Sequence, residues 1–278
     1  MNTLELTLLV GLGSIVAGFF GSLTGLGGGV VIVPLLTLAF GMDIRYAIGA
    51  SLVSVIATSS GAAAAYLREG FINMRIGMFL EIATTLGALA GALVASRLST
   101  SVIAMIFGVV LVYSSYLSSR PRRDRPEPDR PDPLATRLKM DGSYPSFEGP
   151  KSYHVHAVPL GFGLMFVAGT ISGLLGIGSG AVKVLAMDQA MRIPFKVSTT
   201  TSNFMIGVTA AASAGVYLNR GYIDPGLAMP VMLGALLGSL VGAQELVKAR
   251  TRQLRIVFSV IILLLAVEMI YNSLKGVI

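Results

Sequence analysis

The residues best suited to chemistry stand beside two glycine-rich stretches in an otherwise apolar chain. These stretches cover residues 21–34 and 173–183. Glycine at this density unwinds a helix and lets the backbone approach a ligand closely. The short helices expected to follow, from about Val30 and Ala181, would point free N–H groups and the positive ends of their dipoles at the break. Because both breaks would do this, the pattern predicts an anion-binding site between them.

Lys183 lies inside the second of these apolar segments, four residues after Ser179, so one helical face presents both side chains. An ammonium group inside a membrane segment is costly unless it is paired or solvated. An anionic substrate would supply the partner; the alternatives are a structural ion pair with Glu81 or Asp188, or snorkelling. A Ser179–Lys183 hydrolase is a further alternative. No second polar constellation would bind its oxyanion, so we do not expect an enzyme.

Residues 198–203 are six consecutive hydroxyl or amide residues at the start of another apolar segment. The first two fit helix capping, whereas the last three lie deeper, and the amide of Asn203 can donate two hydrogen bonds to an oxyanion. Glu81 is the candidate carrier of a coupling proton, since burial favours the neutral form of a carboxylate. The predicted substrate-binding residues are Gly25, Gly27, Gly28, Gly29, Gly176, Gly178, Ser179, Gly180, Lys183, Ser51, Thr201, Ser202 and Asn203.

The elements that carry these residues are membrane spans. Of the 278 residues 54% are hydrophobic and 13% are charged, whereas soluble domains carry about 25% charged residues. Most of the apolar stretches are close to the roughly 20 residues that cross a bilayer, while the first of each half (4–40 and 157–191) is too long for one straight span. Cysteine is absent, which excludes disulfides and thiolate metal sites. His154 and His156 alone are weak evidence for a metal site, and we expect neither a metal nor a cofactor.

The two halves of the sequence align without a gap at an offset of 151 residues, over about 76 residues, which is a strong sign of duplication. Residues 1–119 and 157–278 therefore form an N-terminal and a C-terminal transmembrane repeat. Between them, residues 120–156 form a polar cytoplasmic linker with eight basic and six acidic residues and seven of the twelve prolines. This composition predicts an extended loop without a core. The net charge of +7 is therefore a feature of topology and gives no sign of nucleic-acid binding. The aligned pairs include Gly25 with Gly176, Gly27 with Gly178, Gly29 with Gly180, Ser51 with Ser202, and Thr58 with Thr209.

The positions of lysine and arginine decide how the repeats are oriented. If each over-long segment crosses the membrane, the halves are parallel, with 12 basic residues inside and 8 outside. If each is a re-entrant hairpin, the halves are inverted, and the numbers become 16 and 4, which fits the positive-inside rule better. The sequence therefore predicts an all-α polytopic membrane protein of two inverted repeats. Each repeat is a glycine-broken re-entrant helix hairpin plus three transmembrane helices, and both termini lie outside.

The duplicated pattern G-x-x-x-G-x-G-G-G, with the chain length and the polar central linker, resembles the TauE/SafE family of sulfite and organosulfonate exporters. The first copy matches fully, including Pro34, whereas the second has Ser179 for the middle glycine, Lys183 within the helix, and Leu185 in place of the proline. The resemblance implies a secondary transporter in the cytoplasmic membrane that exports sulfite or an organosulfonate. The alternative is an anion channel or a permease for another small anion. The expected partners are a small anion, the bilayer and a coupling proton, with a homodimer left open and no nucleic acid.

Overall fold

The computed structural model describes residues 3–24, 28–68, 70–119, 132–146, 149–248 and 251–276. In the first half, a short helix and a π-helical turn follow the first long helix, and three more long helices come after them. The elements are α1 (Thr3–Thr24), α2 (Gly29–Pro34), η1 (Leu35–Ala39), α3 (Ile44–Arg68), α4 (Met74–Ala95) and α5 (Thr100–Ser119).

The second half repeats this order as α7 (Val158–Leu175), α8 (Gly180–Leu185), η2 (Ala186–Ala190), α9 (Phe195–Asn219), α10 (Pro225–Lys248) and α11 (Thr251–Leu274). Each element from α8 onward begins 151 residues after its counterpart in the first half. The gapless sequence repeat is therefore a repeat of structure. Both short helices also begin where the glycine pattern predicts, within one residue.

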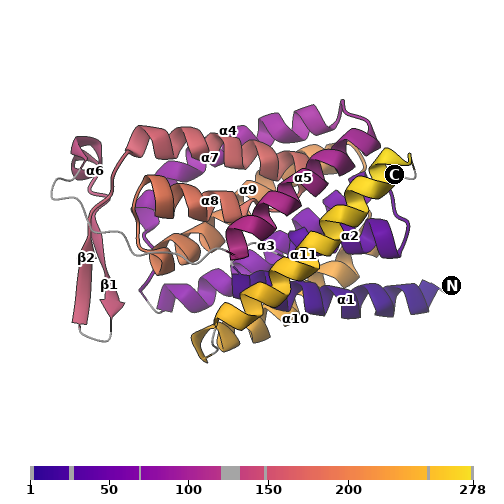
Figure 1. The fold of residues 1–278 in the computed structure, drawn as a ribbon, viewed down its shortest axis with the longest axis horizontal. Coiled ribbons are helices and arrows are strands. Elements are labelled where there is room, and N and C mark those ends of the chain that lie inside the picture. Colours follow the sequence, from indigo (N-terminus) through magenta and orange to yellow (C-terminus); the bar gives the residue numbers. More distant parts are fainter. Residues whose placement is uncertain are drawn as a thin grey trace.

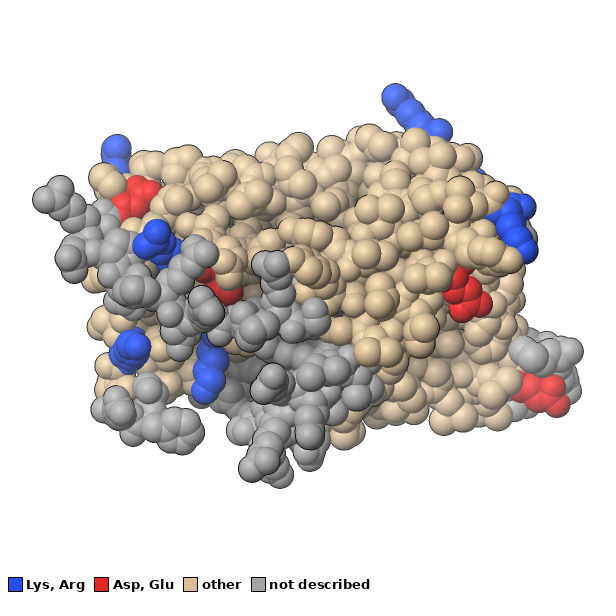
Figure 2. Space-filling view, in the orientation of Figure 1, with Lys and Arg blue, Asp and Glu red and all other residues tan. Residues whose placement is uncertain are grey.

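Apolar side chains cover the outside of the helices. Leu12, Met78, Leu237 and Leu264 are each more than half exposed, and such a surface suits lipid. Among the described residues, four helices are long and apolar enough to cross a membrane: α1, α4, α7 and α10. In the face shown in Figure 2, the charged side chains of the described residues gather toward the two ends, and the described surface between them is uncharged. The molecule is a helical protein built to lie in a bilayer.

Helices of one half pack mainly against helices of the other: α1 on α10, α4 on α7, α3 on α9 and α10, and α5 on α11. Glycine makes two of these crossings close. A Cβ atom at Gly87 or Gly91 of α4 would collide with backbone carbonyls of α7, and one at Gly234, Gly238 or Gly242 with carbonyls of α1. These glycines, spaced four residues apart, therefore serve helix packing, as their pattern indicates.

Each broken segment begins and ends at the same end of the molecule. Leu6 of α1 and Met42, just after η1, line one cavity, and the N–H of His156 donates to the carbonyl of Met191 at the end of η2 (3.0 Å). The chain termini lie at one end of the molecule, and the strands of the central segment lie at the other (Figure 1). The chain thus turns back at both glycine-rich breaks.

The central segment is more structured than its composition predicts, and the expectation of a loop without a core is wrong for residues 132–155. It forms α6 (Pro133–Arg137) and an antiparallel pair, β1 (Gly142–Ser146) and β2 (Gly149–Tyr153). Ala135, Met140, Tyr153 and Val155 are buried in one cluster with residues of α4, η2 and α9. Residues 120–131 lie outside the described part of the chain.

Polar side chains fix this segment to the helix ends. The Asp132 carboxylate caps α6 by accepting from Leu134 N–H and also accepts from Val158 N–H. The Asn73 amide donates to the Tyr153 hydroxyl (2.7 Å) and to the Met140 carbonyl (2.9 Å). Burial raises the pKa of Tyr153, with a smaller opposing effect from Asn73. A few buried side chains that bond to the helix ends therefore order a segment with little hydrophobic sequence.

Candidate functional site

The second break is built from residues with left-handed backbone. Gly176 (φ 67°) ends α7, Gly178 (φ 70°) follows, and Ser179 (φ 46°) precedes α8. A Cβ at Gly176 would lie 2.7 Å from Ile48, so glycine is required there for space as well as for conformation. A non-glycine residue in this region costs about 1–2 kcal/mol, so Ser179 is strained where its repeat counterpart, Gly28, has an ordinary φ of −62°.

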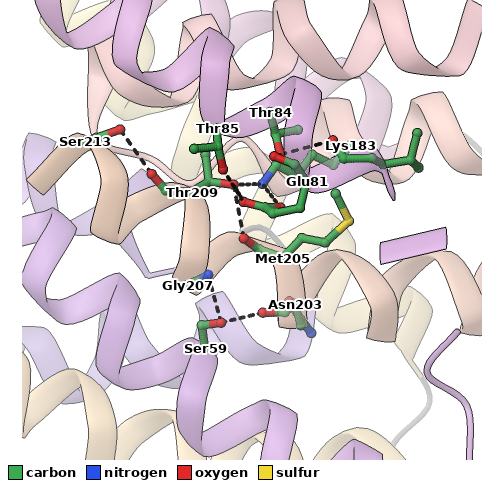
Figure 3. Close-up of polar contacts among 11 residues, drawn as sticks. Ser59, Glu81, Thr84, Thr85, Lys183, Asn203, Met205, Gly207, Thr209 and Ser213 are labelled. Carbon is green, nitrogen blue, oxygen red and sulfur yellow. Dashed lines mark hydrogen bonds and ion pairs between the residues drawn. The ribbon is translucent and has the colours of Figure 1, made fainter. Parts of the chain in front are cut away.

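The second break is followed directly by α8, which carries Lys183 in the interior of the helix bundle with its side chain fully buried. Its Nζ donates to Thr209 Oγ1 of α9 (2.5 Å) and lies 4.0 Å from Glu81 Oε2 of α4 (Figure 3). Thr209 Oγ1 is also 2.6 Å from Glu81 Oε1, which accepts from the Thr85 hydroxyl. The lysine and the carboxylate are therefore bridged by a threonine. Of the alternatives drawn from the sequence, the partner within ion-pair distance is Glu81.

The two breaks lie against each other. A Cβ at Gly29 would meet both Ser51 Oγ and the carbonyl of Gly176. The Ser51 hydroxyl donates to that same carbonyl (2.7 Å), so it ties α3 to the end of α7. Gly25 and Gly27, which the sequence assigns to the site, lie outside the described residues.

A second polar cluster lies beside the first break. A small cavity beside this break has room for about one water molecule. It is lined by Gly21, Ser22, Gly28, Thr58, Ser59, Asn203 and Ile206. The Ser59 hydroxyl donates to the Asn203 carbonyl (2.5 Å) and accepts from Gly207 N–H (3.0 Å) (Figure 3). The side chain of Asn203 is more than nine-tenths buried, and its Nδ2 has no hydrogen-bond partner in the described part of the chain. An amide donor in this state is available to a small acceptor.

Not every predicted residue joins these clusters. Thr201 Oγ1 accepts from Asn73 N–H in the turn between α3 and α4 (3.2 Å), which places it toward the strand end of the molecule. Ser179 and Ser202 have buried hydroxyls without a partner among the described residues. Asp188 belongs to η2 and does not contact Lys183 in any ion pair of the described residues.

Sequence reasoning missed Thr209 and Ser59. The pairing of Thr58 with Thr209 across the repeat was the available signal, but a threonine on an apolar helix more often bonds to its own backbone. Ser59 is aligned with Ala210, so the repeat hides it. His154 lies 3.5 Å from Asp141 at the strand end, and no group of three metal-ligating residues occurs among the described residues.

A bundle of apolar helices with two glycine-rich helix breaks and a buried lysine is typical of multi-pass membrane transporters. The model of the sulfite exporter TauE/SafE family matches residues 10–269. The chain belongs to this family, which is a family of transporters rather than enzymes.

The chain is also similar over nearly its full length to proteins described as probable membrane transporter proteins. It is 28% identical over 279 residues to YunE of Bacillus subtilis (98% of this chain and 99% of that protein). It is 27% identical over 231 residues to YdhB of the same organism (83% and 84%). A protein of Xylella fastidiosa strain 9a5c is 24% identical over 276 residues (98% of each). No solved structure matches the chain.

Proposed function

We propose that this protein is a secondary transporter that exports a small sulfur-containing anion, sulfite or an organosulfonate, across the cytoplasmic membrane. Beyond membership of the family, the proposal rests on one observation: Lys183 is a fully buried cation in the short helix after the second helix break. Its carboxylate neighbour, Glu81, is 4.0 Å away, and a close ion pair has an N–O distance of about 2.7–2.9 Å. A small oxyanion entering this centre would gain a direct, charge-assisted contact with the ammonium group.

The substrate site in this proposal lies between the two breaks, with Lys183 on one side and Asn203 on the other. The ammonium supplies the charge, and the Asn203 amide supplies a neutral donor for a second oxygen. The flanking glycines of the described residues (Gly28, Gly29, Gly176, Gly178 and Gly180) give the backbone close access, while Ser51, Ser179 and Ser202 add hydroxyls. Ile206 lines the Asn203 cavity and also faces Gly178, so α9 links the two clusters.

The topology in this proposal is two inverted repeats, residues 1–119 and 157–278, joined by a cytoplasmic segment at 120–156. Three observations support it: the shared element order, the return of each broken segment to its own starting end, and the opposite ends at which the two segments start. The 11 residues of α2 and η1 extend about 16 Å, roughly half of a hydrocarbon core of about 30 Å. Such half-helices meet at the membrane centre, where transporters bind their substrates.

Coupling is assigned to Glu81. The Glu81 carboxylate lies 4.0 Å from Lys183 Nζ, so a proton carried on it would move together with an anion bound to the ammonium group. An anion channel would use the same centre without this exchange. The two differ in whether flux saturates and whether a pH gradient drives it.

The test is a substrate panel on the purified protein: sulfite, sulfoacetate, taurine, sulfate and chloride. We expect sulfite or a sulfonate to raise the melting temperature of the wild type and to cross proteoliposome membranes in a saturable, pH-dependent way. The same anion should not stabilise the Lys183→Met variant. Equal stabilisation by every anion, or flux that never saturates, would contradict the proposal and favour a channel.

A further inference from the structure

Two basic residues occupy equivalent positions in the two halves and make equivalent contacts. Arg45, in the first turn of α3, lies over the ring of Tyr222, with its Cζ 5.7 Å from the ring centre. Lys196, 151 residues later in the first turn of α9, lies over the ring of Phe71, with its Nζ 5.6 Å away. Tyr222 and Phe71 are themselves 151 residues apart. Each cation thus contacts a turn of the other half, and the arrangement occurs twice.

The two arrangements lie at opposite ends of the molecule. Arg45 donates to the Leu98 carbonyl (2.8 Å), and its neighbour Tyr46 lines a cavity with Leu6, near the N-terminal end of α1. Phe71, by contrast, packs beside Tyr144 of β1, with ring centres 6.4 Å apart. Figure 1 shows β1 at the end of the molecule opposite to both termini.

No carboxylate of the described residues lies within ion-pair distance of either cation, although the Asp43 carboxylate accepts from the backbone N–H of Arg45 (2.8 Å). Among the described residues neither Arg45 nor Lys196 forms an ion pair, and the buried Nε of Arg45 has no hydrogen-bond partner there. Stacking on an aromatic ring holds a cation in place while leaving its charge intact. A fixed positive charge at each end attracts small anions and raises their local concentration.

Each cation lies on the same helix as one residue of the threonine pair, Thr58 on α3 or Thr209 on α9. Arg45 precedes Thr58 by 13 residues and Lys196 precedes Thr209 by 13, which is about 20 Å along each helix. At the outer end the rings continue inward: Tyr217 lies beside Tyr222, with ring centres 6.3 Å apart. The Tyr217 hydroxyl donates to the carbonyl of Leu174 in the last turn of α7 (3.2 Å), directly before the second break.

We propose that Arg45 and Lys196 are a matched pair of anion-docking residues, Arg45 at the outer mouth and Lys196 at the inner mouth of the transport path. The inference rests on the proposed function, because it assigns the two residues to the approach and release of the same anion. It assigns a different membrane face to each residue. Arg45 and Lys196 each bind the anion at one face, and Lys183 binds the anion that arrives from either face.

The first test measures the KM for radiolabelled sulfite separately on each face, in right-side-out and inside-out vesicles. We expect Lys196→Gln to raise the KM at the inner face about threefold to tenfold and to leave the outer value unchanged, with the reverse for Arg45→Gln. The matched controls are Arg192→Gln and Arg97→Gln, which remove exposed charges at the inner and outer ends. Equal changes on both faces, no change, or the same changes in the controls would overturn the inference.

The second test does not depend on which anion is carried. Because the chain has no cysteine, Arg45→Cys and Lys196→Cys each introduce a single thiol. A membrane-impermeant, negatively charged thiosulfonate reagent should label Arg45→Cys from the outer face and Lys196→Cys from the inner face. Labelling of both from one face would overturn the assignment of two mouths, whatever the substrate.

Lipid phosphate is the other anion that these cations could hold. The KM measurements are therefore repeated in vesicles of phosphatidylcholine with and without phosphatidylglycerol. Side-specific shifts that persist without anionic lipid support substrate docking, and shifts that vanish overturn it. The proposed function fails separately: Lys183→Met that transports sulfite normally would refute the central site, whereas unchanged KM values in Arg45→Gln and Lys196→Gln would refute only the mouths.

Discussion

The two halves share a backbone pattern but differ at the centre. Thr209 of the second half bridges Lys183 of the same half and Glu81 of the first half. The equivalent residue of the first half, Thr58, bonds to the carbonyl of Val55 in its own helix. The positions equivalent to Lys183 and Glu81 are Ile32 and Met232. Duplication has therefore kept the scaffold and its two breaks, while the two charges, one from each half, meet at Thr209 and have no counterparts around Thr58. The variants that follow test whether this asymmetry is functional.

The largest effect is expected at Lys183. Replacing it with methionine keeps much of the volume but removes the charge that would hold the anion, and we expect sulfite flux in proteoliposomes to fall by about 100-fold or more, the loss of a charged contact in a buried site. Lys183→Ala should behave in the same way.

The control for Lys183 is the equivalent position. Ile32→Met exchanges one buried apolar side chain for another at a cost below about 1.5 kcal/mol, so flux should stay near the wild-type value. Because Lys183→Met leaves Glu81 without its counter-charge, the double variant Lys183→Met/Glu81→Gln serves as the test of folding. A stable double variant that transports normally would show that the charge pair is structural.

The next effect is expected at Glu81. Glu81→Gln preserves the shape and the acceptor for Thr209 but cannot exchange a proton, so sulfite should still move down its own gradient while a pH gradient no longer drives accumulation. We expect driven flux to fall about tenfold, equivalent to about 1.4 kcal/mol. The measurement is uptake with and without an imposed pH difference. Met232→Gln is the matched control, and loss of pH dependence in that variant instead would reverse the assignment.

A smaller effect is expected at Asn203, whose equivalent in the first half is Leu52. Asn203→Leu makes the two halves alike by removing the unpartnered Nδ2 donor. We expect the KM for sulfite to rise about fivefold, equivalent to about 1 kcal/mol, the net contribution of a typical hydrogen bond. Isotope-flux measurements across a concentration series give the KM, and an unchanged value would exclude the amide from the site.

The smallest effect is expected at the threonine pair itself. Thr209→Val removes the bridge between Lys183 and Glu81, and we expect flux to fall only about threefold, because the two charged groups lie 4.0 Å apart and can pair directly without the threonine. Thr58→Val removes a bond within one helix and should leave flux unchanged. Equal results for the two variants would show that the centre is more symmetric in function than in sequence.

Much of the fold follows from the sequence because two long-range signals agree. Apolar runs mark the helices, and the 151-residue repeat fixes their counterparts, so even the short helices after the breaks could be placed. The site was harder to predict. Lys183 stands out because a charge in an apolar run is costly wherever it lies. Thr209 carries no such signal, since its role depends on where α4 and α8 place their side chains.

For the central segment, the sequence predicted less structure than the protein has. Its prolines and charges predict an extended chain, but the outcome depends on a few contacts with distant residues, such as that between Tyr153 and Asn73. Composition describes the average of a segment, so it does not reveal that four of its side chains (Ala135, Met140, Tyr153 and Val155) are buried. The same averaging makes residues 198–203 look like one polar strip, whereas Thr201 and Asn203 serve different neighbours in the structure.

The close helix pairs that depend on glycine, α1 with α10 and α4 with α7, can form only after both helices of each pair have been synthesised. The partner of α1 is α10, which a ribosome makes about 200 residues later, and α4 must wait for α7. During synthesis the first half therefore sits in the membrane with its small-residue faces open to lipid and to other proteins. The two halves can therefore pack together fully only after α10 has been made, and a chain that ends before α10 would leave the small-residue face of α1 uncovered.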